Sequence, residues 1–229
     1  MTTSPPVIIP RYIAVEGVIG AGKTTLATML ADRFGARLVL ERFEENPFLA
    51  DFYKDQARFA FQTQIFFLLS RYRQQQEFHQ LDLFYENVIS DYIFDKDKIF
   101  ASLTLGEHEM ALYESVLAAL ESSVPKPDLV IYLQSGLTRL VSNIRSRGRA
   151  MEESISMGYL RDLAAAYAQY FFHYTGAPVL IVNTANMDFV NDKSCFEELV
   201  GEICRPSDAQ IRYYHHTRNA DDQPAMLGG

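Results

Sequence analysis

The sequence predicts an α/β protein with a doubly wound, five-stranded parallel sheet. Five short apolar runs alternate along the chain with longer stretches of helical spacing, and strands joined by helices in this way form a parallel sheet covered on both faces. A glycine-rich segment between the first run and the first helical stretch is typical of the same fold. At 229 residues the chain fits one such domain and is too short for two large ones.

The expected strands are short runs of β-branched and aliphatic residues. The first spans residues 7–15, between a pair of prolines and Gly17. Such continuous apolar runs are expected of strands buried on both faces. The other four strands span residues 38–40, 88–90, 129–133 and 179–182.

Helical spacing of apolar residues begins at residue 24 and stops at Gly35, which defines the first helix, 24–34. Residues 59–72 are apolar around nearly the whole helix circumference, so we expect this helix to be buried. Gln64 and Arg71 are its polar exceptions. The remaining expected helices span residues 107–121, 136–144, 155–174 and 191–203.

Residues 1–204 are expected to form the folded domain. The tail, residues 205–229, is polar, ends in two glycines and has no apolar period. Segments that cannot bury apolar surface do not offset the entropy cost of ordering. We therefore expect the tail to be loosely ordered.

Composition excludes several classes of protein. Twenty-one Lys and Arg against 29 Asp and Glu give a net charge of −8, which disfavours a nucleic-acid partner because such binding relies on a basic surface. Cys195 and Cys204 lack disulfide-framework and metal-ligand spacing, so we expect reduced thiols in a cytoplasmic protein. Neither a membrane span nor a signal peptide is expected.

A phosphate-binding loop is the strongest motif in the chain. Residues 17–24 read GVIGAGKT and fit GxxxxGK[ST], between a strand and a helix as the motif requires. Backbone N–H groups of such a loop cradle a polyphosphate, Lys23 neutralises it, and the Thr24 hydroxyl is placed to bind Mg²⁺. The expected ligand is a nucleoside triphosphate, and the expected contacts are Gly17, Gly20, Gly22, Lys23, Thr24 and Thr25.

Two carboxylates follow strands at the edge of the sheet where open α/β proteins bind ligands. Glu41, after the second strand, can act as a general base toward a hydroxyl, although the neighbouring Glu44 and Glu45 leave a solvated acidic loop as an alternative. Asp91, after the third strand, would reach a Mg²⁺ ion or its waters, or else cap a helix.

Gln64 and Arg71 are seven residues apart and therefore share one face of the apolar helix. The amide carries a donor and an acceptor side by side, which suits the edge of a nucleobase, and the guanidinium needs a nearby carboxylate. An internal hydrogen-bond network is the alternative interpretation. Phe100 is among several aromatic residues that could stack on a base.

Three arginines, Arg145, Arg147 and Arg149, crowd a short segment around Gly148. In one continuous helix Arg147 would point away from the other two, so their convergence on a phosphate requires a loop or a helix break. Such a lid would neutralise charge on a transferred phosphoryl group. A solvated basic helix end is the alternative.

From about residue 12 to about residue 200, the chain resembles the deoxynucleoside kinases, the family of deoxycytidine, deoxyguanosine and deoxyadenosine kinases. The phosphate loop alone is common to many proteins, but the following series is specific in this order. Its markers are GVIGAGKTT, the NPFL and FY segments that follow Glu41, FQTQIFFLLSRYR, SDYIFDKDKIFA, RSRGR and YLRDLAAAYAQYF.

The resemblance implies roles for acceptor-site residues. Glu41 matches the base that takes the proton from the 5′-hydroxyl, and Tyr53 and Glu152 match groups that hold the 3′-hydroxyl. Gln64 matches the residue that pairs with the base, and Phe100 the aromatic that stacks on it. The resemblance also implies an Arg71–Asp97 pair over the base, which disfavours thymidine. It further implies that Lys23, Arg147 and Arg149 stabilise the phosphoryl group. Asp188 and Phe189 match the loop that frames the adenine of the donor.

The chain departs from the family pattern at two places. An acid, an arginine and a serine usually follow the third strand, where this chain has Asp91, Tyr92 and Ile93. Tyr92 cannot supply a guanidinium to Glu41, and we expect Lys96 to substitute. Asn143 stands where many relatives begin the lid arginines.

The resemblance therefore implies an ATP- and Mg²⁺-dependent kinase that phosphorylates the 5′-hydroxyl of deoxyadenosine, deoxyguanosine or deoxycytidine, in that order of expectation, for nucleotide salvage. It also implies a homodimer. A monophosphate kinase of the thymidylate kinase type remains an alternative, with Arg71 binding the acceptor phosphate. A nucleotide-binding module without catalysis is another, favoured by Tyr92.

Overall fold

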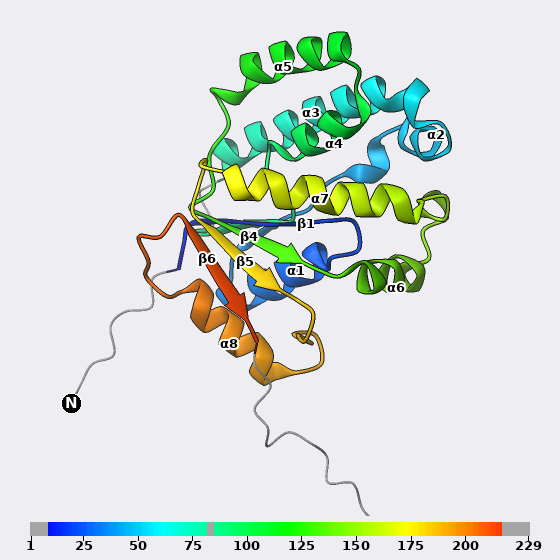
Figure 1. Cartoon of the computed structure of the whole chain (residues 1–229). Coiled ribbons are helices and arrows are strands. Elements are labelled where there is room, and N and C mark those ends of the chain that lie inside the picture. The colour runs from blue at the N-terminus through cyan, green and yellow to red at the C-terminus, as the bar shows by residue number, and fades with distance from the viewer. Residues whose placement is uncertain (1–8, 82–84, 217–229) are drawn as a thin grey trace, which may run out of the picture.

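A computed structural model describes residues 9–81 and 85–216, and its centre is one sheet of parallel strands (Figure 1). The strand order is β2-β3-β1-β4-β5-β6, so β2 and β3 lie on one side of β1 and β4 to β6 lie on the other. The doubly wound parallel fold is confirmed. The strands are β1 (Tyr12–Gly17), β2 (Arg37–Val39), β3 (Val88–Ser90), β4 (Leu129–Gln134), β5 (Val179–Asn183) and β6 (Ile211–His215).

The expected count of five strands is wrong, because β6 adds a sixth strand. It pairs with β5 from Val179 opposite Ile211 to Asn183 opposite His215, within the tail for which no ordered element is predicted. As an edge strand, β6 buries none of its side chains fully, so it carries no apolar run. The rest of the tail, 217–229, and the start of the first predicted strand lie outside the described residues; β1 begins at Tyr12.

Helices cover both faces of the sheet (Figure 1). Helices α1 (Lys23–Phe34) and α8 (Lys193–Ile203) lie on one face, and α3 (Gln56–Leu81), α4 (Lys96–Thr104) and α7 (Met157–His173) lie on the other, with α5 (Glu107–Glu121) outside them. No part of the sequence pattern predicts α2 (Leu49–Lys54) or α4, both of which are short. Helix α6 (Leu137–Arg147) and the short 3₁₀ turns η1 (Phe43–Glu45) and η2 (Ala150–Glu152) complete the elements that position the site.

The core lies on both sides of β1, whose six residues are all buried. Helix α1 ends at Gly35, which has a φ of 61° and therefore favours glycine. Helix α3 is less buried than expected, since Gln62 and Leu69 are exposed, whereas its predicted polar exceptions Gln64 and Arg71 are buried. Among the described residues, no helix combines the length and apolar character that crossing a membrane requires.

Candidate active site

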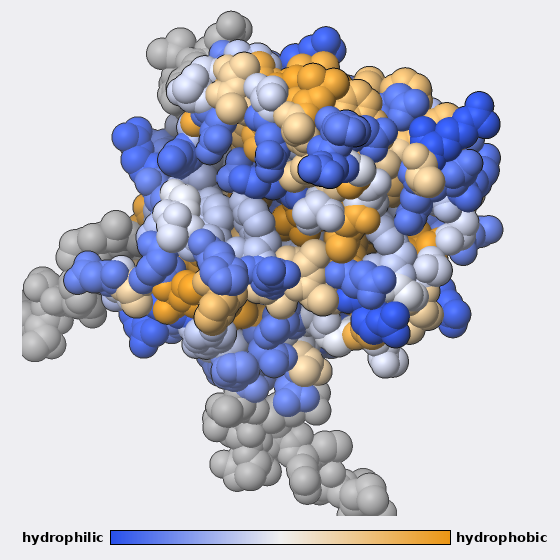
Figure 2. All heavy atoms as spheres, turned by 45° about the horizontal axis from the view of Figure 1, so that its top comes forward, coloured by the Kyte–Doolittle hydropathy of each residue, from blue (hydrophilic) through white to orange (hydrophobic). Residues whose placement is uncertain are grey.

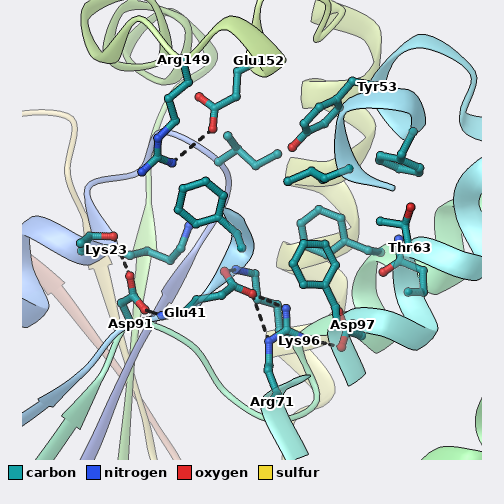
Figure 3. Close-up of a pocket in the computed structure, with 18 of the residues that line it drawn as sticks. Lys23, Glu41, Tyr53, Thr63, Arg71, Asp91, Lys96, Asp97, Arg149 and Glu152 are labelled. Carbon is teal, nitrogen blue, oxygen red and sulfur yellow. Dashed lines mark hydrogen bonds and ion pairs between the residues drawn. The ribbon is translucent and has the colours of Figure 1, made fainter. Parts of the chain in front are cut away.

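A pocket opens at the carboxyl ends of β1, β2 and β3, between the phosphate loop, α3 and the segment after α6 (Figure 3). Ligands bind at this edge in open α/β sheets because the strand order reverses there. The structure brings most of the predicted site residues into this one pocket. They are Lys23, Thr24, Glu41, Tyr53, Gln64, Arg71, Asp91, Asp97, Phe100, Arg147, Arg149 and Glu152.

The phosphate loop has the backbone that its glycines permit. Gly20 has a φ of 85°, and a Cβ atom there would lie 2.7 Å from the carbonyl oxygen of Leu140, so only glycine fits. Asn143 donates from Nδ2 to the Gly20 carbonyl at 2.8 Å and so holds the loop from α6. Lys23 Nζ donates to the carbonyl oxygen of Gly17 at 2.9 Å, so the lysine side chain folds back over the phosphate loop.

The protonation of Lys23 predicts a pH-dependent affinity for ATP. Burial and the nearby Lys96 lower the pKa of Lys23 to about 8, whereas bound phosphate favours the protonated form. ATP binding should therefore take up protons above about pH 8, and affinity should fall about tenfold between about pH 7.5 and pH 9. Calorimetry in two buffers of different ionisation enthalpy measures both quantities. Equal affinity at the two pH values would contradict the prediction.

Two oxygen ligands lie side by side next to the loop. Thr24 Oγ1 donates to Asp91 Oδ2 at 2.6 Å, and Asp91 Oδ1 accepts from the backbone N–H of Glu41 at 2.8 Å. Hydroxyl and carboxylate oxygens suit Mg²⁺, which takes its remaining ligands from phosphate and water. The residues present therefore fit the expected ion, and the described part of the chain has no cluster of three or more His, Cys, Asp or Glu that could hold another metal.

Glu41 lies between two cations. Arg71 donates from Nε to Glu41 Oε1 at 3.1 Å and from Nη2 to the same oxygen, while Lys96 donates to Oε2. Burial by itself would raise the pKa of Glu41, but Lys96 and Arg71 outweigh it and hold that pKa well below its usual range. The solvated-loop interpretation of Glu41 is thereby wrong, and Lys96 lies where a substitute cation is expected.

The guanidinium of Arg71 also reaches across to α4, where it pairs with Asp97. Burial raises the pKa of Asp97 to about 6, against the opposing charge of Arg71. Nearby, the Oε1 atom of Gln64 and the hydroxyl of Thr63 are buried without a hydrogen-bond partner in the described structure. Because unpaired buried acceptors are costly, a ligand with N–H donors is the natural partner of Gln64.

The arginine segment contains the break that convergence requires. Helix α6 ends at Arg147, and Gly148 follows in the left-handed conformation with a φ of 64°. Arg147 then donates to both oxygens of Glu152, at 2.7 and 2.6 Å. Arg149 donates to one of these oxygens at 3.4 Å (Figure 3). Both arginines line the pocket, and Figure 3 shows Arg149 above Lys23.

Besides the three glycines of the phosphate loop, four other predicted residues lie outside this pocket. Arg145 lines a neighbouring hollow formed by α6 and α7. Thr25 is exposed on α1. Phe189 is buried beside the phosphate loop, with its Cζ 3.5 Å from where a Cβ on Gly22 would stand. Asp188 is exposed, and its carboxylate accepts from the Asn191 backbone at 3.1 Å. Phe189 is therefore near the expected donor site, whereas the Asp188 carboxylate stabilises the turn of its own loop.

Comparison with known proteins identifies the family of this chain. Residues 13–206 match the family described as deoxynucleoside kinase. This chain belongs to the deoxynucleoside kinase family. A deoxyguanosine kinase of Bacillus subtilis (strain 168) is 38% identical over 199 residues, which cover 84% of this chain and 95% of the relative. The deoxyadenosine/deoxycytidine kinase of the same strain is 31% identical over 204 residues, with 85% and 93% covered.

The fold is likewise that of a deoxynucleoside kinase. A solved structure of deoxyadenosine kinase from M. mycoides with bound dATP has a TM-score of 0.73 and 27% sequence identity, and the match covers 84% of this chain and 98% of that one. The protein is thus an ATP-dependent deoxynucleoside kinase, which transfers phosphate to a nucleoside.

In this deoxynucleoside kinase, Tyr92 contributes packing to the site. Its side chain is fully buried, and its hydroxyl has no hydrogen-bond partner within residues 9–81 and 85–216. The Arg71 guanidinium lies 5.8 Å from the centre of its ring. The positive charge beside Glu41 therefore comes from Arg71 and Lys96.

Sequence reasoning missed two residues that shape the kinase site. Asn46 donates from Nδ2 to the Thr63 carbonyl at 3.1 Å and accepts from the Phe48 backbone at 3.0 Å, so it ties the segment after Glu41 to α3. Glu16 is completely buried at the end of β1. A carboxylate directly after an apolar run was the available signal for Glu16, since buried charges require partners.

Proposed function

We propose that this enzyme transfers the γ-phosphoryl group of ATP to the 5′-hydroxyl of deoxyadenosine, deoxyguanosine or deoxycytidine. The observation that carries the proposal is the position of Glu41. It lies in the pocket between the phosphate loop and Gln64, and its backbone N–H donates to Asp91. A hydroxyl bound there would have a carboxylate on one side and the transferable phosphate on the other.

The chemistry proceeds by in-line displacement. The 5′-oxygen forms a bond to the γ-phosphorus, the bond from that phosphorus to the β,γ-bridging oxygen breaks, and ADP leaves. The hydroxyl proton passes to Glu41. That proton becomes strongly acidic as the new O–P bond forms, so a carboxylate with a depressed pKa can accept it.

Cationic side chains stabilise the transferred group. Lys23 contacts the phosphate chain. Arg147 and Arg149 give up part of their contact with Glu152 and bind the phosphoryl oxygens, over which negative charge spreads during the transfer. Thr24 and Asp91 would hold Mg²⁺, which neutralises phosphate charge when it is bound. Release of Glu152 from the arginines leaves a carboxylate that can accept from the 3′-hydroxyl beside Tyr53.

Base selection rests on hydrogen-bond complementarity. The unpaired Gln64 Oε1 needs a donor, and Asp97 is a second acceptor beside Arg71. Adenine and cytosine carry exocyclic amino groups, and guanine carries ring N–H and amino groups, all of which donate. Thymine has an N–H but presents a methyl group and carbonyl oxygens instead of an amino group, so it fits this pair of acceptors less well.

A coupled ATP-consumption assay tests the function. It is run with the four deoxynucleosides and with deoxythymidine monophosphate, with and without Mg²⁺. Turnover with deoxyadenosine, deoxyguanosine or deoxycytidine is expected, and it should require Mg²⁺. Turnover with the monophosphate alone would instead identify a monophosphate kinase, and ATP binding without any turnover would identify a non-catalytic module.

The proposed setting is cytoplasmic nucleotide salvage. The free Cys195 and Cys204 fit a reducing compartment. Hydrophobic areas on one face of the molecule are separated by hydrophilic ones (Figure 2), which is typical of a protein that works in water.

The proposed assembly is a homodimer formed through α4 and α7. These neighbouring helices expose apolar side chains, with Phe172 68% and Leu103 39% accessible. Phe172→Arg should therefore weaken the dimer at least tenfold, because burying a phenylalanine contributes roughly 1.5–3 kcal/mol. Analytical ultracentrifugation measures the effect. Val190→Arg, also at an exposed position, is the control, and a Phe172→Arg protein as dimeric as wild type would refute this interface.

A further inference from the structure

Glu16 is a buried carboxylate to which the proposed chemistry assigns no role. It is fully inaccessible to solvent at the end of β1. Its Oε2 accepts from the Gly17 backbone at 3.0 Å and from the Tyr167 hydroxyl at 3.2 Å, and its Oε1 accepts from the Ile93 backbone at 3.0 Å. All three partners donate, which suits a carboxylate that only accepts.

These three bonds join segments that serve different halves of the site. Gly17 begins the phosphate loop, and Tyr167 belongs to α7. Ile93 lies between Asp91, which bonds to Thr24, and Lys96, which bonds to Glu41. One side chain therefore connects the loop that receives ATP with the segment that supplies charge to the acceptor site.

The segment around Ile93 is fixed from its other side as well. Ser90 Oγ donates to the Tyr92 carbonyl at 2.7 Å and also contacts the Tyr12 hydroxyl at 3.2 Å. The backbone is thus held at two consecutive residues, by Ser90 and by Glu16. Buried bonds of this kind leave little freedom to the side chains that follow.

Glu16 also acts through its charge. Burial raises the pKa of Glu16 above its usual value, and the opposing charges of Lys96 and Lys23 reduce this shift without reversing it. Conversely, Glu41 and Glu16 together raise the pKa of Lys96 against burial and the charge of Arg71. The charged groups that surround Lys96 are Glu41, Glu16, Arg71, Lys23 and Asp97.

We propose that Glu16 is a positioning residue for phosphoryl transfer, which aligns the phosphate loop with the Asp91-to-Lys96 segment and holds Lys96 as a cation against Glu41. This inference rests on the proposed function, because it concerns the alignment of the ATP and nucleoside sites. Glu16 does not touch the reacting atoms and acts on them only through the phosphate loop and the Asp91-to-Lys96 segment.

Glu16→Gln tests the proposal with little change of shape. The amide has one acceptor oxygen, and its NH₂ group would face a backbone N–H or the Tyr167 hydroxyl. We expect kcat to fall about 10- to 100-fold with KM for ATP and nucleoside within about threefold. At saturating ATP, the basic limb of the kcat–pH profile should move to lower pH, because Lys96 loses a neighbouring anion.

Tyr167→Phe is the matched control, since it removes one donor and keeps both the charge and the Ile93 contact. Its kcat should stay within about threefold of wild type with an unmoved pH profile. Thermal unfolding verifies that each variant is folded. If Glu16→Gln does not fold, Glu16→Asp keeps the charge but withdraws from Ile93, and it should lower kcat without moving the basic limb.

A folded Glu16→Gln enzyme with wild-type kcat and pH profile would overturn the proposal, as would a Glu16→Asp enzyme with wild-type kcat. A loss in Tyr167→Phe equal to that in Glu16→Gln would overturn it too, because the shared effect would then be packing against α7. Wild-type turnover, measured in the same assay, separates these outcomes from a failure of the proposed function.

Discussion

Glu41→Gln is expected to lower kcat about 10²- to 10⁴-fold while the affinity for the nucleoside changes less than about tenfold. A general base contributes rate enhancement of that order. Glutamine has the same shape but cannot take the 5′-hydroxyl proton. Nucleoside affinity should persist because Gln64 and Asp97, the proposed contacts of the base, are unchanged, and Asp97 still pairs with Arg71.

Single-turnover kinetics and equilibrium nucleoside binding separate the two effects. The matched control is Glu44→Gln, because Glu44 is exposed in the same segment and does not line the pocket. This control should retain wild-type kcat. Turnover of Glu41→Gln within about tenfold of wild type would show that Glu41 is not the base.

Lys96→Met is expected to produce the second largest effect, a fall in kcat of about 10²- to 10³-fold, typical of losing one group that stabilises developing charge. Lys96 is buried against Glu41 Oε2. Its removal leaves Arg71 as the partner of Glu41, so the carboxylate loses its orientation and its pKa rises toward the usual range. Removing one member of a buried ion pair also destabilises the fold.

Two further variants show whether the loss in Lys96→Met comes from the missing charge at this position. Lys98→Met changes an exposed lysine on the same helix and should leave kcat unchanged. Lys96→Arg keeps the charge and should recover part of the activity lost in Lys96→Met. If Lys96→Met has kcat within about threefold of wild type at a temperature where it is folded, Arg71 alone is sufficient and the substitution for the family arginine is not at Lys96.

Local features of the sequence determined a large part of the fold and the donor site. The phosphate loop is specified within residues 17–24, because its glycines and its lysine act through the backbone of neighbouring residues. Gly35 and Gly148 end helices for the same local reason, a positive φ that favours glycine. Helix α5 has the predicted bounds, and β3 does too.

Tertiary structure decided most of the environment of Glu41. The resemblance predicted Lys96 as a substitute cation, but it paired Arg71 with Asp97 and not with Glu41. Arg71 lies 30 residues away in the chain and Lys96 lies 55 residues away, yet both bond to its carboxylate. No local pattern encodes such contacts, because they depend on how α3 and α4 pack over the sheet. The same holds for Glu16, whose Tyr167 partner is 151 residues distant, and for β6, which forms only because the exposed edge of β5 supplies its hydrogen bonds. Sequence thus specified what depends on neighbours along the chain, and packing specified which buried charges meet.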